Sequence, residues 1–385
     1  MADIFDDLIL SAIELRRLLH RKPEITWSEY NTARIIRERL DALGINWRQC
    51  AKTGTVATIG ANMSGRHVAF RADMDALPME ELTRLPWASQ VHGCMHACGH
   101  DGHVAVAIAL AGWLKNHETE LPGPVSFLFQ PAEEGGHGAR QMIKDGALKD
   151  VDAVFGWHNW PAVEFNKAIC PDGTIMAANA IFSITVSGRG GHASQPELCR
   201  DPVLAASAII MAMQQITSRR LPPQHAGVVS VTSIDTPQGD TTIPDKVVLG
   251  GSIRIDDTAL REEMGNQITA IARDTALSYN VSAETLFKPR YSTVDNHSDK
   301  AESFRRAIAD EFGPDWLSRS TPIPIMASED FSYYLEEIPG AFAIIGANDG
   351  ENLCHPCHSA YYDFNDNLIR HVVRIFSRLA GIDVT

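Results

Sequence analysis

The sequence predicts an α/β fold with a mixed, mostly parallel sheet and a second, inserted α+β domain. Its 385 residues, 44% of them hydrophobic, are enough for two domains with their own cores. Strands alternate with helices over residues 1–179 and again over 291–385, as in a parallel sheet. Residues 180–290 instead follow the order β-α-β-β-α-β of a ferredoxin-like unit. We therefore expect a discontinuous first domain, interrupted by the second.

The first domain is predicted to open with two helices. Apolar residues recur at helical spacing over residues 4–20 and 30–43, and Gly44 closes the second helix. Thr26 and Glu29, three residues apart, resemble a capping box before it. The other elements predicted before residue 158 are strands at 55–59, 67–71, 125–129 and 153–157, and helices at 103–117 and 138–145.

The remaining elements follow from the same patterns. In the inserted domain we expect strands at 180–186, 228–234, 246–255 and 281–287, and helices at 201–217 and 258–279. The α/β pattern then resumes with a helix at 299–311, a segment at 322–326, a helix at 329–337, a strand at 341–345 and a terminal helix from 366. The sequence shows no internal repeat or long linker.

Composition excludes several classes of partner. A formal net charge of −14 argues against nucleic acid and anionic membranes. The first residues lack a basic leader with an apolar core, and no apolar run approaches the roughly 18 residues of a membrane span. The seven cysteines, an odd number, favour a reducing compartment over a disulfide scaffold. We therefore expect a cytoplasmic protein.

A dense cluster of metal-binding residue types lies between His92 and His103. This stretch holds four histidines, two cysteines and Asp101, which is placed to cap the apolar helix that follows. Imidazole and thiolate are ligands that zinc and related metals prefer. The spacing is not a zinc-finger pattern, so the cluster alone leaves open a histidine-rich loop that binds nothing.

Other candidate ligands follow predicted strands. Asp73, Glu133, Glu134 and His158 each come after a strand, and the carboxyl ends of parallel strands share one rim. Two metal ions that share a bridging ligand need about five ligand side chains. One of the two adjacent glutamates can coordinate a metal ion while the other accepts a proton from water. The sequence therefore predicts a two-metal centre with these candidate ligands: Cys98, His100, Glu134, His158 and His358.

Seven stretches together resemble the M20 metallopeptidase family, in its aminoacylase and amidohydrolase branch of hippurate hydrolase-like and auxin-conjugate hydrolase-like enzymes. They run in the family order across almost the whole chain, which makes the resemblance specific. They are RADMDALP at 71–78, HACGHDGH at 96–103, FQPAEEG at 129–135, GWH at 156–158, GRGGHA at 188–193, SEDF at 328–331, and His358 ahead of YDFN at 362–365.

The resemblance implies a zinc-peptidase-like catalytic domain with an inserted lid that mediates dimerisation, hence a homodimer or a dimer-based oligomer. It implies that the five candidate ligands hold two divalent ions per subunit, either Zn, Mn, Co or Ni. It makes Glu133 the general base and His192 the lid residue that polarises the scissile carbonyl across the dimer. We expect Asp73 to orient a ligand histidine, and His96 and His103 to support the loop.

Two lid positions depart from the family pattern. Glu197 stands where relatives usually have histidine, and the chain reads Thr241-Thr242-Ile243-Pro244 where relatives usually have asparagine before Val-Ile-Pro. A carboxylate there favours a basic substrate, unless Glu197 points to solvent or pairs with Arg200. Arg254 is a candidate partner for a substrate carboxylate, and a fold-stabilising ion pair is the alternative.

The predicted function is hydrolysis of the amide bond of N-acyl-L-amino acids, of the deacetylase or aminoacylase type, with a preference for a basic moiety such as an N-acetyl diamino acid. The alternative is a dipeptidase or carboxypeptidase with the same centre. A catalytically inactive binding protein is a third class, against which the intact ligand set and Glu133 argue. Cys354 and Cys357 form a Cys-x-x-Cys motif without a thioredoxin-like setting, so a plain reduced loop competes with redox or third-metal roles.

Overall fold

The chain folds into two compact units. The computed structural model describes residues 2–236, 239–351 and 353–384. The first unit contains Met1–Ile175, Asp295–Pro322 and Asp330–Thr385, and the second contains Met176–Val294 and Ile323–Glu329. The second unit thus takes in a short later segment, 323–329, that sequence patterns place with the first domain.

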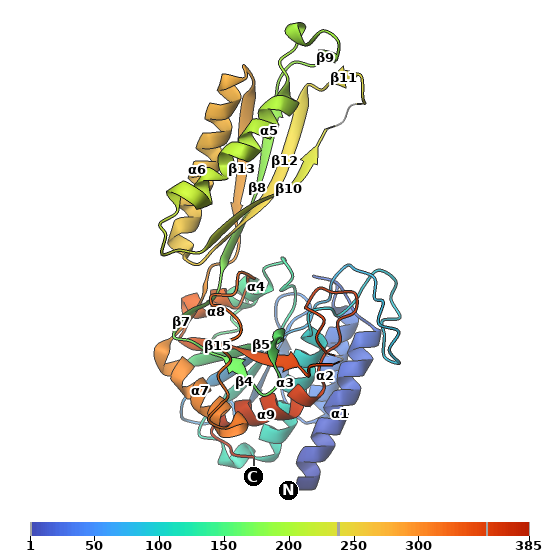
Figure 1. The fold of residues 1–385 in the computed structure, drawn as a ribbon. Coiled ribbons are helices and arrows are strands. Elements are labelled where there is room, and N and C mark those ends of the chain that lie inside the picture. The colour runs from blue at the N-terminus through green and yellow to red at the C-terminus, as the bar shows by residue number, and fades with distance from the viewer. Residues whose placement is uncertain (1, 237–238, 352, 385) are drawn as a thin grey trace. The chain divides into compact units, whose positions relative to one another are not determined.

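The first unit is built on a seven-stranded mixed sheet with the order β1-β2-β4-β3-β5-β15-β6. Figure 1 labels three of its strands, β4, β5 and β15. The pairings of β3 with β4, β3 with β5, and β5 with β15 are parallel, while the outer pairings are antiparallel. This confirms the predicted α/β fold with a mixed sheet. The strands are β1 Trp47–Gln49, β2 Thr55–Ile59, β3 Val68–Asp73, β4 Val125–Gln130, β5 Ala153–Glu164, β6 Ala168–Ile169 and β15 Gly340–Asn348.

Helix α3 (His100–Asn116) occupies the middle of the hydrophobic core. It is buried from His100 to Leu114, and it contacts α1, α9 and β3. A helix that is apolar all round requires cover on every side, and the neighbouring helices and the sheet supply that cover. The other helices of this unit are α1 Ala2–Arg21, α2 Tyr30–Ala42, α4 Gly138–Lys144, α7 Ser298–Phe312, α8 Ser332–Glu337, α9 Asn367–Leu379 and the 3₁₀ turn Glu118–Glu120.

Two predictions of helix capping are wrong. In each case the polar group concerned is bonded to a different residue than the sequence pattern indicates. Glu29 directly precedes α2 but does not cap it, and the carboxylate of Glu24 instead accepts from the backbone N–H groups of Asn31 and Thr32 at 3.0 and 2.7 Å. Asp101 lies inside α3, whose N-terminal residue follows Gly99, and its carboxylate bonds to a histidine of α1 rather than to first-turn amides.

The second unit contains a four-stranded antiparallel sheet with the order β10-β12-β8-β13. Helices α5 and α6 begin after Asp201 and Asp257, whose carboxylates accept from first-turn backbone N–H groups. Its elements are β8 Ala178–Ser187, β9 Gly191–His192, the 3₁₀ turn Pro196–Leu198, α5 Pro202–Met213, the π-helical turn Ile216–Arg220, β10 Gly227–Asp235, β11 Thr242–Ile243, β12 Lys246–Ile255, α6 Thr258–Ser278 and β13 Ser282–Pro289. Strands β7 (Gly173–Met176) and β14 (Val294–Asn296) lie where the chain passes between the units.

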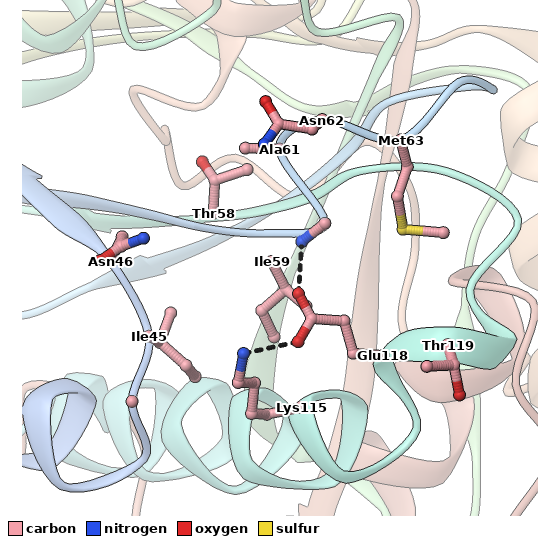
Figure 2. A pocket seen from close by; sticks show the side chains of 12 residues that line it. Ile45, Asn46, Thr58, Ile59, Ala61, Asn62, Met63, Lys115, Glu118 and Thr119 are labelled. Atoms are coloured by element: carbon pink, nitrogen blue, oxygen red, sulfur yellow. Dashed lines mark hydrogen bonds and ion pairs between the residues drawn. The ribbon is translucent and has the colours of Figure 1, made fainter.

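A hollow of about 480 Å³ lies at the C-terminal end of α3. Figure 2 shows Glu118 pointing to Lys115, and the Glu118 carboxylate also accepts from the backbone N–H of Gly60 at 3.2 Å. None of its lining residues is a histidine or cysteine. Lys115 is roughly 22 Å along the helix from His100, so this hollow is separate from the predicted metal ligands. Among the described residues, no helix is both long and apolar enough to span a bilayer.

Candidate functional site

The candidate site lies in the first unit, where strand ends and loops meet the start of α3. Asp73 is the last residue of β3, and Glu133 and Glu134 follow β4. His158 does not end a strand as predicted but lies inside β5, which continues to Glu164. His358 comes from the loop after β15, and Cys98 lies two residues before α3 begins.

All five predicted ligands lie in two overlapping groups. The ligand atoms of Cys98, His100 and His158 lie within 4.8 Å of one another, as do those of Cys98, Glu134 and His358. The Cys98 Sγ is 3.3 Å from His158 Nε2, and the Glu134 Oε1 is 3.2 Å from His358 Nε2. Cys98 belongs to both groups.

Backbone carbonyls orient two of the histidines. The Nδ1 of His100 is 2.9 Å from the carbonyl oxygen of Asp75, and the Nδ1 of His158 is 2.7 Å from that of Asn159. A carbonyl only accepts, so each Nδ1 carries the proton and donates it. Each Nε2 therefore keeps a lone pair for a metal. The His100 Nε2 is buried, with no hydrogen-bond partner in the part of the chain that the structure describes.

Asp75 secures the loop that carries the paired glutamates, and sequence patterns did not single it out. Its two carboxylate oxygens accept from the backbone N–H groups of Glu133 and Glu134 at 3.0 and 3.1 Å. The hydroxyl of Thr26 donates to it at 2.8 Å. The spacing of Asp73-Met-Asp75 could have indicated a role for Asp75, because it puts a second carboxylate just past the end of β3.

Asp73 is buried and faces positive groups on several sides. It accepts from Arg71 and, at 2.5 Å, from His103 Nδ1, and its Oδ2 is 3.6 Å from His100 Nε2. Burial would raise the pKa of this carboxyl, but Arg71, His100 and His103 hold it well below its usual range. The histidine that Asp73 bonds is His103, which lies outside the predicted ligand set.

The site's electrostatics favour a bound cation. Burial would lower the pKa of His100, but the carboxylates of Asp73 and Asp75 raise it to about 10. Burial, together with His103, lowers the pKa of His158 well below its usual value, which keeps this imidazole neutral. The acidic groups thus stabilise positive charge at His100, a charge that either a proton or a metal ion supplies.

Two backbone features fix the loops. Gly99 has φ of 96°, and a Cβ there would lie 2.3 Å from Asn159 Oδ1 and 2.5 Å from the Tyr362 hydroxyl. Only glycine therefore fits between Cys98 and His100. His358 also has a positive φ, 65°, and its backbone N–H donates to the carbonyl of Ala97 at 2.7 Å. This bond holds the His358 loop beside the cysteine loop.

The other predicted site residues belong to the second unit. His192 and Thr242 are cross-strand partners in the β9–β11 pair, and both are exposed. Glu197 is exposed on a 3₁₀ turn, and no ion pair joins it to Arg200 within the described residues. Arg254 is half-buried on β12, where its NH1 donates to the Ile253 carbonyl at 3.0 Å. Burial and the neighbouring Arg290 lower its pKa.

The donor set in the first unit fits divalent metal ions. It combines thiolate, imidazole and carboxylate ligands, which suit zinc and several other transition metals. Among the residues that the structure describes, the buried His100 Nε2 has no hydrogen-bond partner, and the buried Glu134 Oε1 lies 3.2 Å from His358 Nε2 without making a hydrogen bond. Buried polar atoms are normally satisfied, so these two atoms point to metal ions held by the two groups.

The chain is similar to several known proteins, one of which is a dinuclear metal-binding peptidase. The chain is 35% identical over 381 residues to "IAA-amino acid hydrolase ILR1-like 2" of Arabidopsis thaliana, covering 98% of this chain and 85% of that protein. It is 37% identical over 345 residues to "N-acetyl-L-cysteine deacetylase" of Bacillus subtilis, covering 89% and 82%. The crystal structure of the Bacillus subtilis YXEP protein, a "dinuclear metal binding peptidase from M20 family", matches with a TM-score of 0.82 at 32% identity, covering 97% and 98%.

The family profile of "Peptidase family M20/M25/M40" matches residues 69–381. That range contains every predicted metal ligand and the whole second unit. It confirms the resemblance that the motifs indicate, and the chain belongs to peptidase family M20/M25/M40.

Proposed function

We propose that this protein is a metal-dependent amidohydrolase that cleaves the amide bond of N-acyl-L-amino acids. The observation that carries the proposal is the position of Cys98, shared by two ligand groups, with the buried carboxylate of Glu133 beside them. One relative is named a hydrolase of an IAA-amino acid and the other a deacetylase of N-acetyl-L-cysteine, and both names support cleavage of an N-acyl amino acid. A peptide-like amide in a dipeptidase or carboxypeptidase reaction is the alternative.

Cys98, His100, Glu134, His158 and His358 would hold the metals, which would be Zn, Mn, Co or Ni. When bound, two divalent ions would polarise the scissile carbonyl and make a water molecule acidic enough to attack at neutral pH. Asp73 would steady this centre through His103 and Arg71. Cys98, with its several sulfur lone pairs, would bridge the two groups.

Glu133 would act as the general base. Its side chain is 7% exposed, and its ligand atom lies within 4.8 Å of those of His100 and Glu134. The Asp75 carboxylate accepts a hydrogen bond from the backbone N–H of Glu133 and so fixes the position of the Glu133 backbone. Glu133 would accept the proton of the attacking water and hand it to the departing amine, which needs a proton to leave.

The second unit would be the lid and dimerisation domain. Its β-α-β-β-α-β order and its strand order agree with a ferredoxin-like topology. Helix α5 exposes Leu204 and Met211, the latter 73% exposed, and edge strand β10 exposes Val228 and Ile234. A monomer gains nothing by leaving such apolar groups in water, so they support a homodimer built through this unit.

His192 would polarise the scissile carbonyl from this lid, in a neighbouring subunit. Its Nδ1 accepts from the backbone N–H and the hydroxyl of Ser194, at 3.1 and 2.8 Å. Because Nδ1 accepts, a neutral ring carries its proton on Nε2, where it is available to an oxygen that becomes negative in the transition state.

Lid residues would also select the amino-acid moiety. Arg254 has no ion pair with a carboxylate among the described residues, and burial together with a second cation, Arg290, lowers its pKa, so the substrate's α-carboxylate would be a favourable partner. Exposed Glu197 would attract a basic side chain, and Thr242, paired with His192, would line the same region. We therefore propose a preference for N-acetyl diamino acids.

We also propose that the protein works in a reducing compartment such as the cytoplasm. Its seven cysteines are all unpaired, and four of them are buried in or near the core. Free thiols in this number are typical of reducing surroundings.

Replacing a ligand should remove metal. His158→Ala is expected to lose bound metal and activity, because Nε2 of His158 completes a group that includes Cys98. His92→Ala is the matched control, since His92 lies in the same histidine-rich stretch of the chain, His92–His103, but its side chain is exposed beside Glu80. Elemental analysis of purified proteins measures the metal content. Full occupancy in active His158→Ala protein would contradict the ligand assignment.

The paired glutamates should separate binding from catalysis. Glu133→Gln is expected to keep its metals and lose about 10²–10⁴ in kcat, because an amide cannot accept the water's proton. Glu134→Gln should instead lose metal. Steady-state kinetics with parallel metal analysis distinguishes the two variants. If Glu133→Gln stays within a few-fold of the unmodified enzyme, another residue is the base.

Subunit mixing tests His192. The His192→Ala variant should lose about 10²–10³ in kcat while keeping its metals, as for loss of a donor to the oxyanion. When it is mixed with Glu133→Gln protein under subunit exchange, activity should return, because a mixed dimer holds one site with both residues intact. Mixed dimers that form without regaining activity would overturn the cross-subunit role.

Substrate selection can be read from one ratio. In the unmodified enzyme, kcat/KM should be higher for an N-acetyl-ornithine-type than for an N-acetyl-glutamate-type substrate, since a close charge pair is worth about 1–3 kcal/mol. Glu197→Gln should shrink that ratio. An unchanged ratio would show that Glu197 does not select the substrate, and faster cleavage of dipeptides than of N-acyl amino acids would favour the peptidase alternative.

A further inference from the structure

A second thiol, Cys357, lies beside the candidate metal centre without belonging to its ligand groups. Its Sγ is 4.0 Å from the carbonyl oxygen of Cys98 and 3.9 Å from Nδ2 of Asn159. The next residue, His358, bonds through its backbone N–H to Ala97. The two cysteine-bearing loops are therefore hydrogen-bonded side by side at this point.

The side chain of Cys357 also affects the Cys98 thiol. Its proximity, followed in importance by burial, raises the pKa of Cys98 well above its ordinary value. Both sulfurs are free, and both side chains are half-buried. Next to them, the Asn159 side-chain amide donates a hydrogen bond to the Tyr362 hydroxyl at 2.7 Å. The pair is thus held close by the backbone bond between the two loops and by the contact of Cys357 Sγ with the Cys98 carbonyl.

The position of Cys357 favours a partner for Cys98 over a further metal ligand. Among the described residues, no group of three ligand atoms within 4.8 Å includes Cys357. The other member of the Cys-x-x-Cys motif, Cys354, is exposed, and its Sγ contacts the carbonyl of Glu351 at 3.8 Å. The thiol that faces Cys357 across the loops is therefore that of Cys98.

We propose that Cys98 and Cys357 form a reversible disulfide that prevents metal loading. The effect on loading rests on the proposed role of Cys98 as a bridging ligand. A sulfur committed to a disulfide has no negative charge to offer a metal, and Cys98 is common to both ligand groups. One oxidation would therefore disable both halves of the centre together.

The oxidant is a hydroperoxide. A thiolate at Cys357 attacks one peroxide oxygen, the O–O bond breaks, and with one proton taken up the products are a sulfenic acid and water. The Cys98 thiol then attacks this sulfur, forms the S–S bond and displaces the hydroxyl, which leaves as water with the thiol's proton. Overall, two thiols and one hydrogen peroxide give one disulfide and two waters. A dithiol such as dithiothreitol reverses the change by thiol–disulfide exchange.

Peptide mapping of the full-length, metal-free protein tests the cross-link. Chelator-treated protein is exposed to hydrogen peroxide, quenched with catalase, alkylated and analysed by mass spectrometry. The peptide pair that contains Cys98 and Cys357 is expected to weigh two hydrogen atoms less than the sum of the two unalkylated peptides. Its fragment spectra should show that the two cysteines are cross-linked. The Cys357→Ser and Cys357→Ala variants should lose the cross-link, while Cys354→Ser and Cys94→Ser should keep it. A Cys354–Cys357 bond, or no bond, would overturn the proposal.

Metal uptake provides the second readout. Oxidised protein should bind less added Zn²⁺ by elemental analysis than its reduced form, dithiothreitol should restore uptake, and oxidised Cys357→Ser should load like the reduced protein. If the Cys98–Cys357 disulfide forms while Zn²⁺ uptake is unaffected, the proposal that the disulfide prevents metal binding is overturned. The assignment of Cys98 as a metal ligand is then overturned as well. If no bond forms but reduced protein loads normally, the redox inference fails alone and the proposed function stands.

Discussion

The buried carboxylate of Asp75 is the constraint on which the candidate site depends. It accepts hydrogen bonds from the backbone N–H groups of both Glu133 and Glu134, while the carbonyl oxygen of the same residue accepts one from the Nδ1–H of His100. One residue just past the end of β3 therefore positions both the loop after β4 and the start of α3. Hydrogen bonds to a charged acceptor are worth about 1.5–3 kcal/mol each, which is enough to hold a short loop in one geometry.

A second buried network fixes the same helix start from behind. The Asp101 carboxylate is 2.8 Å from His20 Nδ1 and 4.0 Å from Arg16, all three without solvent exposure. Burial alone would lower the pKa of His20, but Asp101 raises it to about 9. Buried ion pairs are weak contributors to stability, yet removing one partner is costly, so this network specifies where α1 meets α3. The first turn that holds His100 is thereby fixed from both sides.

These two networks explain what sequence alone predicts and what it misses. Glu134 and His158 were predicted as neighbours because both lie on or just after strands of one parallel sheet core, a rule that needs no side-chain detail. Asp75 and His20 were missed because their partners are distant in sequence. Thr26 was predicted to cap α2, but Glu24 reaches those amides and Thr26 bonds Asp75 instead. Local patterns predict elements, while long-range pairing decides which polar group serves which partner.

A thiol at the point common to both ligand groups has a chemical consequence beyond coordination. Without a metal, the proximity of Cys357, burial and the nearby Glu134 raise the pKa of Cys98 and keep it protonated. A divalent ion bound here would reverse this balance, because it would stabilise the thiolate and engage its lone pairs. The same sulfur would therefore be protected when coordinated and available to a neighbouring thiol when it is not. A carboxylate at this position could also bind metal, but would have no such second state.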